Sequence, residues 1–234
     1  LIYMEPIIEL TDLTINRIDS ETFKIHIEHN SDKNTHIIFA YIFERINPDS
    51  EKDVDYLIKQ EYSLNLKAKS VRTFQEYLEQ NNYRLEYDVV LKILHELSNI
   101  ILYLERKQKT IIQFSLDDLI VLDNGDFLFV NNENIFNFTS EKSNKVTIYV
   151  PLEINNFSAP ELQQVSEIPF TLDYRVGYFS LASFLCYCLF AETLIDKDDS
   201  EIEKILEPIY DTKLYRFISR CREKNINNRI CLFI

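Results

Sequence analysis

Two groups of side chains in this sequence have types and spacing that could bind a metal ion. Cys186 and Cys188 form a Cys-x-Cys pair inside an apolar run, and Asp196–Glu203 reads DKDDSEIE. Thiolates are ligands for zinc, and carboxylates are ligands for calcium and magnesium. The histidines lie far from the cysteine pair in sequence, and the acidic stretch lacks the glycine and the spacing of an EF-hand loop. We therefore predict buried free thiols in a reducing compartment, and a solvated acidic loop that leads into a helix.

The glycine content restricts how the chain could bind a nucleotide. Only Gly125 and Gly177 occur in 234 residues. Phosphate-binding loops need several glycines, because backbone N–H groups must approach the anion closely. The count excludes a Walker loop, a GxGxxG turn and a GxSxG nucleophile elbow. We expect no cofactor and no bound metal ion.

Composition and charge indicate a folded, acidic protein. The chain has 25 Lys and Arg against 38 Asp and Glu, a net charge of −13, and 46% hydrophobic residues. This hydrophobic content can form a core, so disorder of the bulk of the chain is not expected. The acidity argues against nucleic-acid binding, which needs a clustered positive field. The longest apolar run, Phe179–Phe190, is too short to span a bilayer, so we expect no membrane partner.

The first part of the chain is predicted to be rich in β-strands. The segments Leu13–Ile18, Phe23–Glu28 and His36–Phe43 carry many β-branched and aromatic residues and are separated by polar turn residues. The pattern predicts an antiparallel meander of three strands, followed by a short helix that reaches Ile58.

From Ser70 onwards the pattern becomes helical. Ser70 is predicted to cap a helix over Val71–Gln80, and Tyr87–Lys107 carries apolar residues at three- and four-residue spacing. Leu119–Leu122 and Phe127–Val130 flank an Asn-Gly pair, which is a strong signal for a β-hairpin.

The last third of the chain is also predicted to be mainly helical. Beyond an expected strand at Val146–Val150, we predict a helical turn at Ala159–Val165, a helix at Tyr178–Ala191, and two further helices near Glu201–Leu206 and Leu214–Glu223. The helix at Tyr178–Ala191 is apolar on nearly every face, so it should lie at the centre of a domain.

This order of elements, together with several short motifs, resembles the protein kinase family. Ser70–Arg106 resembles the two helices that open a kinase C-terminal lobe. Residues 118–133, DLIVLDNGDFLFVNNE, align without a gap on the family pattern N-I-L-L-D-x-N-G-x-I-K-L-x-D-F-G. Residues 158–161 (SAPE) resemble the end of the activation segment, and residues 179–182 (FSLA) resemble the W-S-L-G of the central helix.

Near the end of the chain, Arg220-Cys221 and Arg229 resemble the late arginines of the kinase fold. The match covers roughly Ser70–Ile234, and it covers Thr11–Gln60 by pattern only. Each motif is weak alone, but five in the correct order are specific. The arrangement also resembles kinase-like proteins of large DNA viruses.

The resemblance implies an α+β, protein kinase-like fold. A small, reduced, β-rich N-terminal lobe would cover residues 1–66, and a larger, mainly helical C-terminal lobe would cover residues 67–234.

The resemblance also implies that the catalytic residues are replaced. The catalytic loop H-R-D-x-K-x-x-N corresponds to residues 111–118, so Gln113 stands at the catalytic acid and Ser115 at the lysine. Asp118 stands at the metal-binding asparagine, and Asn131 stands at the aspartate of D-F-G. A carboxamide cannot accept a proton near neutral pH. These degenerate positions should leave little stabilisation of a phosphoryl-transfer transition state.

The lysine of the third kinase strand has no obvious counterpart. The segment HIIFAYIF places Tyr41 or Ile42 at that position. Lys24 on the preceding strand is a possible substitute, although we favour a solvated strand lysine.

Parts of the kinase scaffold are retained. Glu161 and Arg229 stand at positions that form a buried ion pair in the family. Gly177 replaces an aspartate that braces the catalytic loop in the family. Retained architecture with lost chemistry is typical of a pseudokinase.

We therefore expect a catalytically inactive pseudokinase that binds proteins, as a scaffold or an allosteric module. It would be cytoplasmic, in a host cell or in a virion, and its oligomeric state stays open. An atypical nucleotide-binding kinase that uses Lys24, Asp117 and Asp118, and a purely structural virion subunit, are the alternatives.

The surface expected to bind the partner is the β-rich segment Leu13–Ile58. Four apolar side chains of its third predicted strand would share one face, and without the family's covering helix that face would be partly open. The alternative is that the face packs on Asp53–Ile58. The four side chains are Ile37, Phe39, Tyr41 and Phe43.

Overall fold

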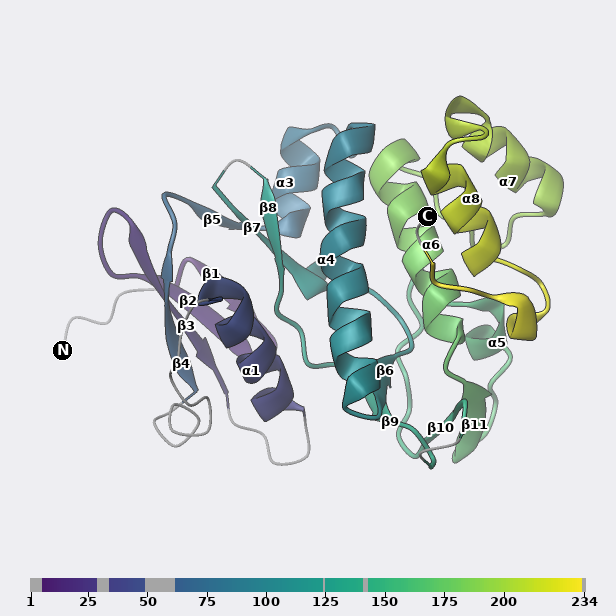
Figure 1. The fold of residues 1–234 in the computed structure, drawn as a ribbon, viewed down its shortest axis with the longest axis horizontal. Helices are drawn as coiled ribbons and strands as arrows, with labels where there is room; N and C mark the ends of the chain where they lie inside the picture. The colour runs from purple at the N-terminus through teal and green to yellow at the C-terminus, as the bar shows by residue number, and fades with distance from the viewer. Residues whose placement is uncertain (1–5, 29–33, 49–61, 124, 141–142, 233–234) are drawn as a thin grey trace. The chain divides into compact units, whose positions relative to one another are not determined.

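The computed structural model of the chain describes residues 6–28, 34–48, 62–123, 125–140 and 143–232 (Figure 1). The described part is mixed α/β, with small antiparallel sheets. Two compact units alternate along the sequence. Unit 1 comprises Leu1–Glu79 and Leu116–Glu133, and unit 2 comprises Gln80–Ser115 and Asn134–Ile234. The expected division into lobes at residues 66 and 67 stays a prediction.

Unit 1 contains an antiparallel sheet in the order β1-β2-β3-β4 and a second antiparallel sheet in the order β5-β7-β8. The predicted strands at Leu13–Ile18 and Phe23–Glu28 are present as β2 and β3, with Ile15 opposite Ile25. The elements are β1 (Ile8–Leu10), β2 (Leu13–Arg17), β3 (Thr22–Ile27), α1 (Thr35–Ile46), β4 (Ser63–Lys67), β5 (Val71–Thr73), α3 (Phe74–Gln80), the 3₁₀ turn η1 (Leu116–Asp118), β7 (Leu119–Leu122) and β8 (Asp126–Phe129).

The prediction of a strand over His36–Phe43 is wrong, because this segment lies inside helix α1. A short, continuous apolar run does not distinguish a buried strand from a buried helix. Ile38 and Ile42 are as fully buried as Phe39, so the run is covered on more than one side. The alignment of Tyr41 or Ile42 with the lysine of a third strand is therefore wrong as well.

The open apolar face expected on this segment is also wrong. Its four members are all buried, and so are Ile38 and Ile42 on other sides of α1. The predicted helix that reaches Ile58, and the packing alternative at Asp53–Ile58, lie outside the described residues. The four buried side chains are Ile37, Phe39, Tyr41 and Phe43.

Helix α3 begins later than the sequence predicts. Val71–Thr73 forms strand β5, which pairs with β7, and Thr73 rather than Ser70 caps the helix. The Thr73 hydroxyl accepts a hydrogen bond from the Glu76 amide at 3.1 Å, and the Glu76 carboxylate accepts one from the Thr73 amide at 2.9 Å. This reciprocal capping box satisfies two amides that the helix leaves unpaired. Pairing with β7 extends the backbone before the cap.

The predicted β-hairpin is confirmed as β7 and β8. Leu119 lies opposite Phe129, and Leu122 lies opposite Asp126. Gly125 in the turn has a φ of 109°, a conformation that side chains disfavour and glycine adopts readily.

Unit 2 contains two-stranded antiparallel sheets, β6 with β9 and β10 with β11, and a group of helices. Helix α6 packs against α4 and α8, as Figure 1 shows. The elements are α4 (Tyr87–Arg106), β6 (Lys109–Ile111), β9 (Ile135–Asn137), β10 (Lys145–Ile148), α5 (Pro160–Gln163), β11 (Phe170–Asp173), α6 (Val176–Phe190), α7 (Asp199–Leu206), α8 (Lys213–Cys221) and the 3₁₀ turns η2 (Glu207–Ile209) and η3 (Ile226–Asn228).

Helix α6 forms the core of unit 2, as its uniform hydrophobicity predicts. Every residue from Val176 to Cys186 is buried. Cys186 and Cys188 are buried free thiols, and burial raises the pKa of the Cys186 thiol to about 12. None of the helices in the described residues has both the length and the apolar character that a membrane span requires.

Candidate functional site

The segment that the resemblance aligns with the start of the catalytic loop, residues 111–115, lies against the first turns of α6 in unit 2. A Cβ atom at Gly177 would lie 2.0 Å from the carbonyl oxygen of Ile111. The backbone of the segment therefore packs directly on the helix, where any side chain at Gly177 would collide with it. The Ser180 hydroxyl accepts a hydrogen bond from the Phe114 amide at 2.8 Å, and this bond is buried.

Gln113, which the resemblance aligns with the catalytic acid, is only 4% exposed, and both polar atoms of its side chain form hydrogen bonds. Its Nε2 atom donates a hydrogen bond to the carbonyl oxygen of Glu153 at 2.7 Å. Its Oε1 atom accepts a hydrogen bond from the hydroxyl of Ser158, which is itself buried. The side chain thus connects the 111–115 segment to residues 153–158.

Asn155 makes a second connection between the same two segments. Its Nδ2 atom donates a hydrogen bond to the carbonyl oxygen of Phe114 at 2.8 Å, and its Oδ1 atom accepts one from the Phe157 amide at 2.8 Å. We call the side chains of Gln113, Asn155, Ser158 and Ser180 the Gln113 network. Buried polar groups of this kind stabilise a single arrangement when every member is satisfied.

Ser115, at the position of the catalytic lysine, follows this segment and is half-buried. Its hydroxyl carries no positive charge, so it could not bind a phosphate as a lysine does.

Asp118 and Asn131, at the two metal-binding positions, lie together in unit 1 at the ends of the β7–β8 hairpin. The Nδ2 atom of Asn131 donates a hydrogen bond to Oδ1 of buried Asp118 at 2.8 Å, and the Val130 amide donates one to the Asp118 carbonyl at 2.9 Å. Oδ1 of Asn131 accepts a hydrogen bond from the Glu133 amide at 3.0 Å. Both polar atoms of the Asn131 side chain therefore form hydrogen bonds within the protein.

A cavity of about 30 Å³ lies beside Asn131 within unit 1. The turn between β1 and β2 lines it, together with Asp117 and residues 130–133. Small-molecule sites typically measure about 300–1,000 Å³, whereas this cavity has room only for water. Its lining residues include Asp12, Asp117 and Glu133 and no lysine or arginine, so it would repel a polyphosphate.

Lys24, the possible substitute for the catalytic lysine, lies on β3 opposite Asn16 and Asn65. It is exposed and is not one of the residues that line the cavity. Among the described residues, no three His, Cys, Asp or Glu side chains gather in a way that could hold a metal ion.

Glu161 and Arg229, the two scaffold positions, form a bidentate ion pair in unit 2 across 68 positions of sequence. The guanidinium donates to the two carboxylate oxygens at 2.6 and 3.2 Å, and it donates to the Glu223 carbonyl at 2.9 Å. It also lies 5.3 Å from the centre of the Phe179 ring. Arg229 is 3% exposed, so it joins α5, α6 and the segment after α8 from inside the unit.

The acidic stretch Asp196–Glu203 contains a helix cap. Asp198 and Glu201 form a capping box at the start of α7, with both hydrogen bonds at 2.9 Å.

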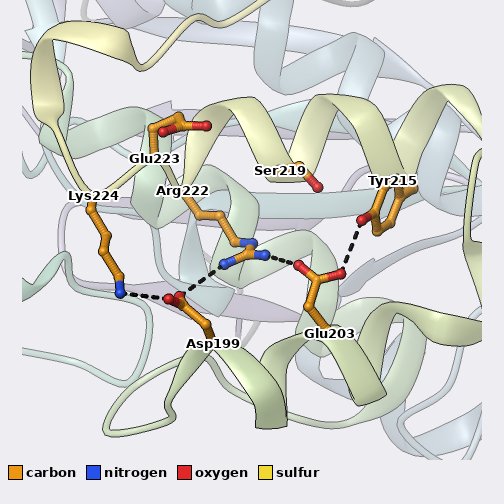
Figure 2. A pocket seen from close by; sticks show the side chains of 7 residues that line it. All are labelled: Asp199, Glu203, Tyr215, Ser219, Arg222, Glu223 and Lys224. Atoms are coloured by element: carbon orange, nitrogen blue, oxygen red, sulfur yellow. Dashed lines mark hydrogen bonds and ion pairs between the residues drawn. The ribbon is translucent and has the colours of Figure 1, made fainter.

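The next acidic residues, Asp199 and Glu203, point toward cations across a pocket of about 460 Å³, as Figure 2 shows. Lys224 lies 2.5 Å from Asp199 and lowers the pKa of its carboxyl group. Arg222 contacts both carboxylates, and Tyr215 donates a hydrogen bond to Glu203 at 2.9 Å. These charged side chains form ion pairs with one another, so they would gain little from a further ion pair with a charged ligand.

Sequence reasoning found Gln113 but missed its partners Asn155, Ser158 and Ser180. Ser158 and Ser180 fall inside the SAPE and FSLA motifs, which are the only signal that marks them.

Neither a protein-family model nor a curated protein matches this chain.

Proposed function

We propose that the chain is a catalytically inactive, kinase-like protein that acts by binding other proteins, as a scaffold or an allosteric module. The observation that carries the proposal is the state of Gln113. The residue at the position of the catalytic acid is a buried carboxamide with both polar atoms bonded inside the protein.

Phosphoryl transfer needs a group that accepts or orients the proton of the attacking hydroxyl. Gln113 has no basic site at neutral pH, and its buried carboxamide donates one hydrogen bond to Glu153 and accepts one from Ser158 inside the protein. Its environment supports a structural role in place of a catalytic one.

The metal-binding and nucleotide-binding positions support the same proposal. Phosphoryl transfer also needs magnesium held by carboxylate and amide oxygens and phosphates held by cations or backbone amides. Asp118 and Asn131 bond to each other, and the cavity beside them is small and lined by carboxylates. The acid, the lysine and the metal-binding carboxylate act as a unit in phosphoryl transfer, so the loss of all three leaves little stabilisation of the transition state, although their separate costs do not add.

The retained scaffold supports a kinase-like arrangement of a small β-rich lobe and a larger helical lobe. In unit 1 helix α1 lies in sequence between strands β3 and β4 of the four-stranded sheet, which supports a small lobe with a single covering helix. In unit 2 the Glu161–Arg229 ion pair and the buried helix α6 support the same arrangement, because the resemblance aligns them with the buried ion pair and the central helix of the family. Such a protein would act in the cytoplasm or a virion through a protein partner.

Phosphotransfer from radiolabelled ATP tests this proposal. With Mg²⁺ or Mn²⁺ and generic protein acceptors, the chain should label nothing above the level of heat-denatured protein. Gln113→Asp, which restores the acid, should stay inactive because the lysine and the metal-binding aspartate are still missing. Labelling by the native chain that disappears in Asp118→Ala would overturn the proposal.

Nucleotide binding is a separate test, measured as the melting temperature with ATP and Mg²⁺. A ligand that binds the native state adds about 2.7 kcal/mol of stability at a hundredfold excess over its Kd. We expect no shift up to millimolar ATP. A saturable rise would instead favour an atypical nucleotide-binding kinase.

A further inference from the structure

Exposed apolar side chains gather on one segment of unit 2, between the end of β10 and the start of β11. Tyr149 is 72% exposed, Ile154 is 41% exposed and Ile168 is 44% exposed, and Val150 is also exposed. Single exposed apolar residues are common, but several along one segment mark an interaction surface.

This segment forms a groove of about 210 Å³. One wall is formed by Pro151, Leu152 and Ile154, and the other by residues between Leu162 and Phe170. Leu152, Leu162 and Val165 add to its apolar lining. The volume is below that of sites for small molecules, about 300–1,000 Å³, and it suits one large apolar side chain inserted by a protein partner. We call this feature the 151–170 groove.

The segment that forms the 151–170 groove carries charged side chains of one sign. Residues 146–174 contain no lysine, arginine or histidine. Two of their acidic side chains are neutralised, Glu161 by Arg229 and Asp173 by Arg175.

Two further acidic side chains, Glu153 and Glu167, are exposed and form no ion pair with the described residues. Glu167 lines the groove, and Glu153 lies in sequence between the lining residues Leu152 and Ile154. The whole chain carries a net charge of −13. A partner with basic residues beside its apolar anchor would therefore be attracted, and an acidic one would be repelled.

The Gln113 network holds one wall of the groove. Gln113 donates its hydrogen bond to the carbonyl of Glu153, and Asn155 directly after Ile154 bonds to the Phe114 carbonyl. A wall fixed in this way loses little freedom when a partner binds, which favours affinity. The residue at the former acid position thus serves as a positioning residue for the surface.

We propose that the 151–170 groove binds a segment of a partner protein that presents one or two large apolar side chains flanked by lysine or arginine. This inference rests on the proposed protein-binding function and names its surface and the chemistry of its partner.

Fluorescence anisotropy with defined peptides tests the proposal on the full chain. The probe is a fluorescein-labelled dodecapeptide with two central leucines and three lysines on each side. One comparison peptide has glutamate in place of the lysines, and another has serine in place of the leucines. At 150 mM salt, only the lysine-flanked leucine peptide should bind saturably.

Two double variants examine the groove. Ile154→Ser with Ile168→Ser should weaken binding at least about tenfold, as expected for the loss of a central anchor site. Glu153→Lys with Glu167→Lys should weaken it by a similar factor and should allow the glutamate-flanked peptide to bind. Both sets of side chains are exposed, so the melting temperature should change little.

The matched control is Glu9→Lys with Glu44→Lys, which makes the same change in net charge at exposed acidic positions of unit 1. It should bind the probe within twofold of the native chain. Equal weakening by this control would show that only overall charge attracts the peptide, and it would overturn the proposal.

The remaining outcomes separate this inference from the proposed function. Absence of probe binding, or binding unchanged in the groove variants, overturns the groove and leaves the pseudokinase scaffold to be judged by the phosphotransfer and nucleotide assays. Self-association in sedimentation that the groove variants abolish would assign the groove to a second copy of the chain and would also overturn the basic partner.

Discussion

Replacing Gln113 by glutamate should destabilise the chain at neutral pH. The substitution keeps the shape of the side chain and removes the Nε2 hydrogens that bond to the Glu153 carbonyl at 2.7 Å. The introduced carboxylate oxygen would face that carbonyl oxygen inside the protein. A lost hydrogen bond costs about 1 kcal/mol and an unsatisfied buried polar group about 1–3 kcal/mol more. We expect a loss of about 3 kcal/mol in the free energy of unfolding at pH 7.

The loss should depend on pH with a defined sign. Burial and the facing carbonyl disfavour the charged form, so the pKa of the introduced carboxyl group is higher in the folded chain than its ordinary value of about 4.3. Below pH 4.3 the group is protonated in both states and can donate a hydrogen bond to Glu153, so the deficit is smallest there. The deficit grows as the pH rises and reaches its full size above the folded pKa.

Urea unfolding of the native chain and the variant at pH 4 and pH 7 measures this difference. Gln163→Glu is the matched control, because Gln163 is an exposed glutamine on α5. It should stay within about 0.5 kcal/mol of the native chain at both pH values. An equal deficit at pH 4 and pH 7, or no deficit at pH 7, would refute the reasoning that Gln113 is a buried donor.

Three further predictions concern unit 2. Gly177→Ala should lower the melting temperature strongly or prevent folding, because its Cβ atom would lie 2.0 Å from a backbone oxygen. Glu161→Ala should cost about 3 kcal/mol in urea unfolding, since it leaves Arg229 buried without a counter-charge, and Glu161→Ala with Arg229→Met should cost less than the single change. In native conditions a thiol reagent should modify the partly exposed Cys231 before Cys186, because burial raises the pKa of the Cys186 thiol to about 12. Modification of both cysteines at the same rate would contradict the burial of Cys186.

The elements that the sequence predicted well are those whose hydrophobic pattern is long. Tyr87–Arg106 repeats apolar residues over five turns, and Val176–Phe190 is apolar on all sides, so both could be recognised as helices. His36–Phe43 is only eight residues long and is apolar from Ile37 to Phe43, which suits a strand or a helix equally well. The residues that pack around this segment in unit 1 decide between strand and helix, and these tertiary contacts cannot be predicted from the local sequence pattern alone.

The partners of the candidate site were harder to predict than its positions. Gln113 meets Glu153 and Ser158 across 40 and 45 positions. Such hydrogen bonds have no periodic signal, because each joins two loops that only the tertiary fold brings together. The alignment of short motifs did place Glu161 and Arg229, which form an ion pair in the structure.

The hydrogen bonds of Gln113 link the proposed loss of a catalytic acid to the proposed 151–170 groove. An aspartate at this position would carry no donor for the Glu153 carbonyl, and its charge would be buried against that oxygen. The carboxamide satisfies both the carbonyl and the Ser158 hydroxyl, so it fixes residues 153–158 against α6 through Phe114 and Ser180. In the proposed kinase-like alignment, the residue that replaces a proton acceptor also holds the wall of the proposed 151–170 groove. A rigid binding surface would then be a sufficient physical reason for a glutamine at the position that the proposal aligns with the catalytic acid.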